Sequence, residues 1–136
     1  MRFDRTLLTE LLRGVLGLTY LFGGSVHVYF WATDQRVYAE ITQFVLIDKY
    51  RAFWTDFVLP NLDALLPMLA VFEAFIAIAI LSKGQIARIG LAAGGAFNLA
   101  VAPLGFWWPS NVVLAALHMA LLRVSYTETA VERVLQ

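Results

Sequence analysis

Residues 64–81 read ALLPMLAVFEAFIAIAIL, an almost unbroken apolar run with one ionisable side chain, Glu73, near its middle. A helix needs about 20 predominantly apolar residues to cross the hydrocarbon core of a bilayer, so this run is just long enough to span a membrane. A carboxylate at the centre of such a helix costs about 3 kcal/mol on insertion scales, and such a group normally faces a helix-bundle interior or a wet cavity. Glu73 is therefore the first candidate functional residue.

Three further apolar blocks flank this run. They cover about residues 7–31, 85–102 and 106–124, and one long connection, residues 32–63, follows the first of them. Hydrophobic residues make up 60% of the 136-residue chain and charged residues 15%, whereas soluble domains are about half apolar and a quarter charged. We therefore predict an all-α fold, in which residues 1–136 form a single transmembrane domain with four helices in one bundle.

Basic residues are distributed unevenly between the two ends of the predicted bundle. With a cytoplasmic amino terminus, seven of them lie on the inner side and three on the outer side. Because lysine and arginine concentrate in cytoplasmic segments, the sequence predicts that both termini are cytoplasmic. No basic patch of the kind that binds nucleic acid is present. The inner residues are Arg2, Arg5, Arg13, Lys83, Arg88, Arg123 and Arg133, and the outer ones are Arg36, Lys49 and Arg51.

The content of cysteine and histidine limits the redox and metal chemistry of the chain. With no cysteine, the chain cannot form a disulfide, a dithiol pair or a thiolate metal site. Its two histidines are His27 and His118, and helical rise places them about 6 and 15 Å below the outer edge of the bundle. This difference in depth disfavours bis-histidine ligation of haem. Two histidines and one intramembrane acid are also too few ligands for a metal site, so we predict no metal.

Small and polar residues recur at helical spacing on one face of the 7–31 helix. Positions separated by four and three residues share a face, so this side should point into the bundle. The 85–102 helix carries a small-xxx-small pattern, which lets membrane helices approach closely. The recurring residues are Arg13, Gly17, Tyr20, Gly24 and His27 in the first helix and Gly90 and Gly94 in the other. We predict packing contacts for the four glycines and structural roles for Arg13 and Tyr20.

Four polar side chains are predicted to share a pocket that opens toward the outer face. Helical rise places Glu73 about 15 Å deep, near the level of His118. Asn98 and His27 lie closer to the outer edge. Because a carboxylate is unfavourable in hydrocarbon, the neutral acid form, which can donate a hydrogen bond, is favoured. The alternative is a packing seam whose polar groups merely bond to one another.

The connection over residues 32–63 is too long for an ordinary structureless loop. Its apolar residues, among them Val37, Ile41, Phe44 and Trp54, suggest amphipathic helical segments. We expect these segments to lie along the membrane surface, to cap the bundle, or to be covered by a partner protein.

Short motifs in the first three helices resemble those of the DoxX family of small four-helix bacterial membrane proteins. The chain reads LLRGVLG over residues 11–17, YLFGGS over 20–25, FEA over 72–74 and ILSKG over 80–84. The resemblance implies a four-helix bundle in the bacterial inner membrane with both termini in the cytoplasm. Arg13 and Glu73 look like the family's arginine in the first helix and acidic residue in the second. The related four-helix reductases use cysteine pairs, which this chain lacks.

The same resemblance leads to the functional hypotheses. Members of the family have been tied to thiosulfate:quinone oxidoreductase and to membrane complexes that handle oxidative stress. The resemblance therefore implies a membrane subunit of a larger redox complex, with quinone as the cofactor and with lipid and other membrane subunits as partners. Because the interior holds no complete catalytic set, a non-catalytic structural or assembly subunit is the alternative. A small transporter is a third hypothesis, which four helices without an internal repeat disfavour.

Overall fold

The computed structural model describes residues 5–134, and within this range the chain forms helices and turns but no strands. Arg2, which contributed to the predicted charge asymmetry, lies outside the described residues. The α-helices are α1 (Arg5–Thr33), α2 (Arg36–Glu40), α3 (Asp48–Phe53), α4 (Leu62–Leu81), α5 (Gly84–Val101), α6 (Trp108–Leu121) and α7 (Ala130–Val134). Short 3-10 turns cover Ile41–Phe44, Leu59–Asn61 and Ala102–Leu104, and a π-helical turn covers Trp54–Val58.

Three helical segments are long and apolar enough to cross a membrane. They are Leu7–Thr33, Asp48–Leu81 and Gly84–Leu104, and the shorter apolar helix α6 lies beside them. With 14 residues, α6 is about 21 Å long, which is less than the roughly 30 Å of a hydrocarbon core. The predicted span over residues 106–124 is therefore too long, although the fold is that of a small helical membrane protein.

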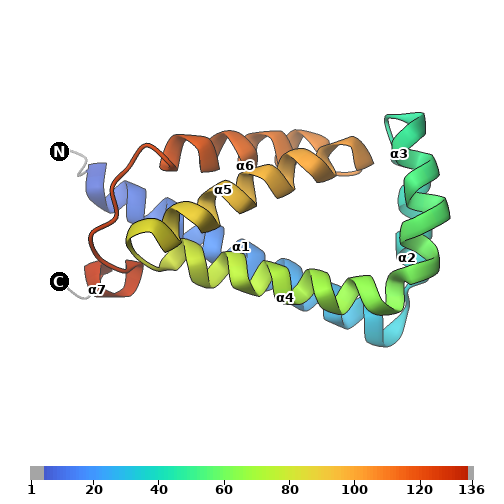
Figure 1. The fold of residues 1–136 in the computed structure, drawn as a ribbon, viewed down its shortest axis with the longest axis horizontal. Coiled ribbons are helices and arrows are strands. Elements are labelled where there is room, and N and C mark those ends of the chain that lie inside the picture. Colours follow the sequence, from blue (N-terminus) through green and yellow to red (C-terminus); the bar gives the residue numbers. More distant parts are fainter. Residues whose placement is uncertain (1–4, 135–136) are drawn as a thin grey trace.

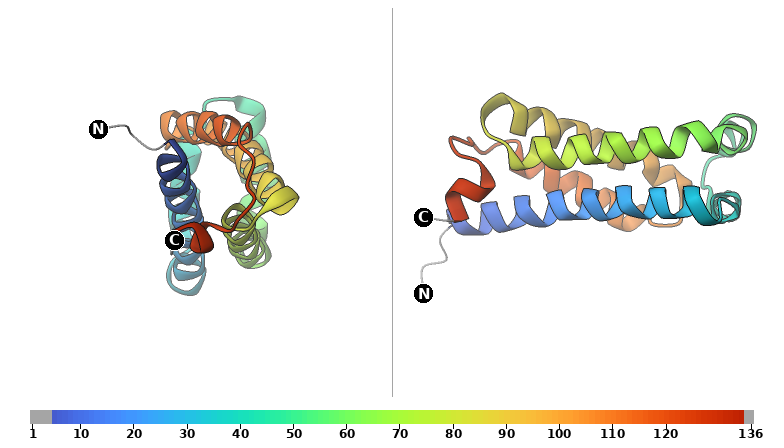
Figure 2. Two further views of the ribbon diagram at one scale, coloured as in Figure 1. Left: turned by 90° about the vertical axis from the view of Figure 1, so that its left-hand side faces the viewer. Right: turned by 90° about the horizontal axis from the view of Figure 1, so that it is seen from below.

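The helices form two antiparallel pairs. The first pair is α1 with α4 and the second is α5 with α6, and α4 also packs against α5. Both described chain ends and α7 lie at one end of the bundle, which we call the terminal end, whereas α2 and α3 lie across the opposite end, the capped end (Figure 1). The two pairs diverge toward the capped end. Seen along the bundle, the four long helices surround a common centre (Figure 2).

Helix α4 accommodates a proline in its interior. Because α4 begins at Leu62, Pro67 is its sixth residue and lies past the first turn. Proline has no N–H to donate to the carbonyl four residues earlier, here that of Asp63. The indole Nε1 of Trp31 on α1 donates to this carbonyl oxygen at 3.1 Å. The bond satisfies the carbonyl and ties α1 to α4 at the capped end.

The connection over residues 32–63 caps the bundle. Tyr38 of α2 is buried with Leu62 and Leu66 in a small apolar core, and Trp54 packs against it. The indole Nε1 of Trp54 donates to the Tyr38 carbonyl at 2.9 Å. Further along, the Leu46 N–H donates to the Pro103 carbonyl at 3.0 Å. Of the three arrangements expected for this segment, the structure shows the cap.

Three of the four predicted packing glycines lie where helices come close together. A Cβ atom on Gly90 would lie 2.6 Å from the backbone nitrogen of Ile80, so α5 approaches the backbone of α4 there. A Cβ on Gly24 would lie 3.2 Å from the Ala70 carbonyl oxygen, and Gly17 faces the side chain of Leu81. These contacts hold α4 tightly between α1 and α5.

Candidate functional site

A partly open cavity of about 610 Å³ lies between the diverging helix pairs. Its walls come from the four long helices and its roof from the connection, including Tyr38 and Trp54. This volume falls within the range of about 300–1,000 Å³ that small-molecule sites occupy, and the largely aromatic and aliphatic lining is also typical of them. All four residues predicted to share a pocket line this cavity, namely Glu73, His118, Asn98 and His27.

Two of these four residues form a closed hydrogen-bonded group with Tyr20. The Nδ2 of Asn98 donates to the Tyr20 hydroxyl oxygen at 2.7 Å, and this hydroxyl lies 3.2 Å from Nε2 of His118. The Nδ1 of His118 lies 2.7 Å from the Leu114 carbonyl oxygen, which can only accept. In the neutral ring, Nδ1 therefore carries the hydrogen and Nε2 accepts. Tyr20 thus donates to His118 and accepts from Asn98, which links α1, α5 and α6.

Gly94 makes room for this group. A Cβ atom at this position would lie 2.6 Å from the Tyr20 hydroxyl oxygen and would also meet the ring of His118. The Gly94 carbonyl accepts a second hydrogen bond from Nδ2 of Asn98, at 2.8 Å. Gly94 therefore contacts buried polar side chains of the neighbouring helices α1 and α6.

A second polar group forms beneath the roof, around His27. Its Nδ1 lies 2.5 Å from the Tyr38 hydroxyl oxygen, and its Nε2 lies 3.6 Å from Oε1 of Glu73. Burial raises the pKa of Tyr38 to about 12, with a smaller contribution from the charge of Glu73. Glu73 is 5% exposed, and its Oε2 has no hydrogen-bond partner in the described part of the protein. This buried acceptor lies against Gly23, which also lines the cavity.

Backbone depth did not indicate which polar side chain lies nearest to Glu73. Counting residues placed Glu73 level with His118, whereas its carboxylate lies beside His27. Helical side chains lean toward the amino terminus of their own helix. Since α1 and α4 are antiparallel, His27 leans toward the terminal end and Glu73 toward the capped end. The two side chains therefore meet although their backbone atoms lie at different depths in the bundle.

Sequence reasoning missed Tyr38 as a member of the site. It lies on the short helix α2, within the connection, and is 6% exposed. Its only signal in the sequence is a tyrosine between the apolar residues Val37 and Ile41. Those two residues also line the roof of the cavity.

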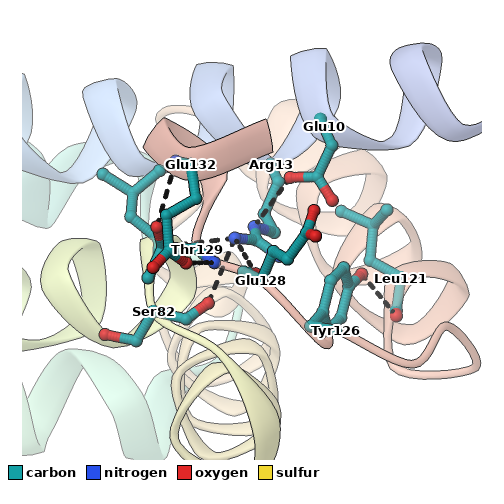
Figure 3. Close-up of polar contacts among 9 residues, drawn as sticks. Glu10, Arg13, Ser82, Leu121, Tyr126, Glu128, Thr129 and Glu132 are labelled. Carbon is teal, nitrogen blue, oxygen red and sulfur yellow. Dashed lines mark hydrogen bonds and ion pairs between the residues drawn. The ribbon is translucent and has the colours of Figure 1, made fainter. Parts of the chain in front are cut away.

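A third polar group, around Arg13, lies at the terminal end and outside the cavity (Figure 3). The Arg13 side chain is fully buried. Its guanidinium lies over the ring of Tyr126, 4.5 Å from the centroid, and its Nε lies 3.4 Å from Oε2 of Glu10. Its Nη2 donates to the carbonyl oxygens of Leu81, Ser82 and Glu128 at 3.2, 3.1 and 3.5 Å. Arg13 therefore joins α1 to the α4–α5 turn and to the carboxyl-terminal segment.

The segment after α6 is held by its own hydrogen bonds. The Tyr126 hydroxyl donates to the Leu121 carbonyl at 2.8 Å, and the Tyr126 carbonyl accepts from the Gly84 N–H, also at 2.8 Å. Burial raises the pKa of Tyr126 to about 12, an effect that the positive charge of Arg13 partly opposes. Thr129 and Glu132 form a reciprocal cap at the start of α7, with bonds of 2.7 and 3.1 Å. These contacts explain why the chain stops being helical after Leu121, before the end of the predicted apolar block.

Comparison with known proteins identifies no relative. No family model, curated protein or solved structure matches the chain. Among the described residues, no group of three or more histidine, aspartate and glutamate side chains is placed to hold a metal ion. The fold and the apolar spans thus define the chain as a small multi-pass helical membrane protein.

Proposed function

We propose that the protein is a membrane subunit of a quinone-linked redox complex and that the cavity receives a quinone headgroup. The observation that carries this proposal is a largely apolar cavity of about 610 Å³ whose lining includes Glu73, a buried carboxyl residue with one oxygen, Oε2, that has no hydrogen-bond partner in the described part of the protein. Such a combination of aromatic walls and few polar groups suits a flat, mostly apolar ligand that needs one or two directed hydrogen bonds.

The residues around His27 suit the chemistry of quinone oxygens. A quinone carbonyl accepts a hydrogen bond, and a quinol hydroxyl donates one. Glu73 can donate as the neutral acid and accept as the carboxylate, while its neighbour His27 can exchange a proton with it across 3.6 Å. Phe97 and Tyr20, whose ring centroids are 6.4 Å apart, provide aromatic surface for the ring of the ligand.

The resemblance to the DoxX family supports the same proposal through Arg13 and Glu73. It also supports a location in the bacterial inner membrane with both termini in the cytoplasm. Lys83 and Arg123 belong to the turns at the terminal end, whereas Arg36, Lys49 and Arg51 belong to the connection at the capped end. This distribution agrees with a cytoplasmic terminal end, because basic residues are enriched there.

The test measures quinone bound to the purified protein in lipid nanodiscs, with decylubiquinone as the probe. We expect the wild type to bind it and Glu73→Leu, which cannot form a hydrogen bond, to bind about tenfold more weakly, a loss of about 1.4 kcal/mol. Glu73→Gln, which keeps a donor and an acceptor, should retain part of the affinity. Asp48→Asn, an exposed change at the start of α3, is the matched control and should bind normally. Wild-type protein that binds no decylubiquinone would refute the proposal.

A structural or assembly role is the second candidate function. It is favoured by the group of Tyr20, Asn98 and His118, whose hydrogen bonds are satisfied within the protein. Under this alternative, changes at Glu73 alter the stability of the protein but not the activity of the complex that contains it. Loss of electron transfer in a well-assembled Glu73→Gln complex would exclude this alternative.

A further inference from the structure

The open side of the cavity is the gap between α1 and α6. On α1, the lining residues Thr19 and Phe22 are exposed, with Phe22 at 72%. On the other side of the gap, Trp107 and Ser110 also line the cavity and are exposed, with Trp107 at 64%. A residue that both lines a cavity and faces the outside marks its rim, so these two rows form the mouth.

The remaining sides of the cavity are largely closed. Extensive packing joins α1 to α4 and α5 to α6. Between α4 and α5, Phe72 and Phe97 meet edge to face with ring centroids 5.6 Å apart. The lining residues on these two helices are buried or half-buried, among them Glu73 and Asn98. The connection covers most of the capped end, as described for Tyr38 and Trp54, and its exposed lining residues Glu40 and Phe44 extend the rim to that end.

The mouth is apolar at the rim and polar at the floor. Phe22, Phe44 and Trp107 are large exposed rim residues; Phe22 lies on the α1 flank, inside an apolar span, whereas Phe44 belongs to the connection at the capped end. Apolar spans adjoin this flank on α1, so it faces acyl chains when the helices cross a bilayer. Glu73, whose buried Oε2 has no hydrogen-bond partner among the described residues, belongs to the polar part of the cavity lining. A molecule that matches this change from an apolar rim to a polar floor has a polar head and an apolar tail.

We infer that the cavity is loaded sideways from the membrane, through the gap between α1 and α6, by a tailed amphiphile. The head passes between the rim residues toward Glu73 and His27, and the tail stays in the gap among the acyl chains. The inference deepens the proposed function and rests on it for the nature of the head, because a long-chain quinone is one such amphiphile. A neighbouring transmembrane helix fits less well, because a body about 10 Å wide would close the mouth and leave the polar floor unpaired.

The experiment uses the full chain in phosphatidylcholine vesicles that contain a phospholipid with a photoreactive diazirine on one acyl chain. Leu114, which lines the cavity, and its neighbour Val113, which is 66% exposed and does not line it, form a matched pair on α6. We expect light to label both residues, because the acyl chain that carries the diazirine lies in the gap beside Leu114 and against the outer surface at Val113. Labelling of Val113 without labelling of Leu114 would overturn the inference.

A rim variant separates access through the gap from access by another route. Ser110→Trp adds bulk at the mouth and should reduce labelling of Leu114 about tenfold while leaving labelling of Val113 unchanged. Unchanged labelling of Leu114 in this variant would contradict lateral loading. Excess decylubiquinone should displace the label from the cavity. If the label enters but the quinone does not displace it, lateral loading stands and the proposed quinone function fails.

Discussion

At the scale of single residues, the Tyr20 hydroxyl carries two buried interhelical hydrogen bonds, to Asn98 and to His118. Tyr20→Phe removes both bonds, which leaves the buried Nε2 of His118 without its partner and Nδ2 of Asn98 with the Gly94 carbonyl alone, at a cost of about 1–3 kcal/mol. We therefore expect the free energy of unfolding to fall by this amount in detergent–lipid mixtures titrated with sodium dodecyl sulfate. Tyr29→Phe, at a position that is 61% exposed, is the control and should change it by less than about 0.5 kcal/mol. Equal stability of Tyr20→Phe and wild type would contradict this role.

The sequence located the polar residues of the cavity better than it located their partners. Helical periodicity places Tyr20 and His27 on one face because it depends only on backbone geometry. It says nothing of how far a side chain reaches along the bundle, so it placed Glu73 near the level of His118 without indicating that His27 lies 3.6 Å from its carboxylate. Tyr38 was missed because its burial depends on how α2 folds over the capped end. The contact between Tyr38 and the start of α4 joins elements that are distant in the sequence, so no local sequence pattern predicts it.

At the scale of elements, close packing of α5 on α4 depends on the missing side chain of Gly90. A methyl group there would lie 2.6 Å from the Ile80 nitrogen, and backbone cannot yield as a flexible side chain does. Gly90→Ala should destabilise the protein by about 1–3 kcal/mol through overpacking. Gly14→Ala adds the same methyl group where no atom lies within 4 Å, and should be neutral or stabilise by up to about 1 kcal/mol. The same detergent titration distinguishes them, and equal effects would refute the packing argument.

Apolar runs predicted the first three long helices to within a few residues but overestimated the fourth. Residues 106–124 are mostly apolar, yet α6 covers only Trp108–Leu121. Leu122, the first residue after the helix, packs against the core without being helical. Further along, the hydroxyl and the carbonyl of Tyr126 bond to Leu121 and Gly84. Hydrophobic composition indicates that residues are buried, but it does not show where a helix ends. Here the end of the helix depends on tertiary hydrogen bonds.

At the scale of the whole molecule, the two ends of the bundle differ in structure. The capped end holds the cavity and its roof, and the terminal end holds Arg13 and the segment that follows α6. The two helix pairs diverge from the terminal end, so contacts there set how far apart α1 and α6 stand at the mouth. Arg13 joins its own helix α1 to two other chain segments, the α4–α5 turn and the segment after α6, which makes it the main link between segments at the terminal end.

Replacing Arg13 with methionine tests this view of the molecule. Methionine keeps much of the apolar stem but donates to none of the three carbonyls and leaves the ring of Tyr126 without its cation. Hydrogen bonds from a charged group contribute about 1.5–3 kcal/mol. Amide hydrogen exchange over residues 122–134 should therefore become about ten- to a hundredfold faster. The Gly84 amide, which donates to the Tyr126 carbonyl, should lose protection with them, whereas the exposed change Arg88→Met should leave both regions as in the wild type. Exchange is read by mass spectrometry in nanodiscs, and an unchanged rate over 122–134 would show that other contacts hold the terminal end together.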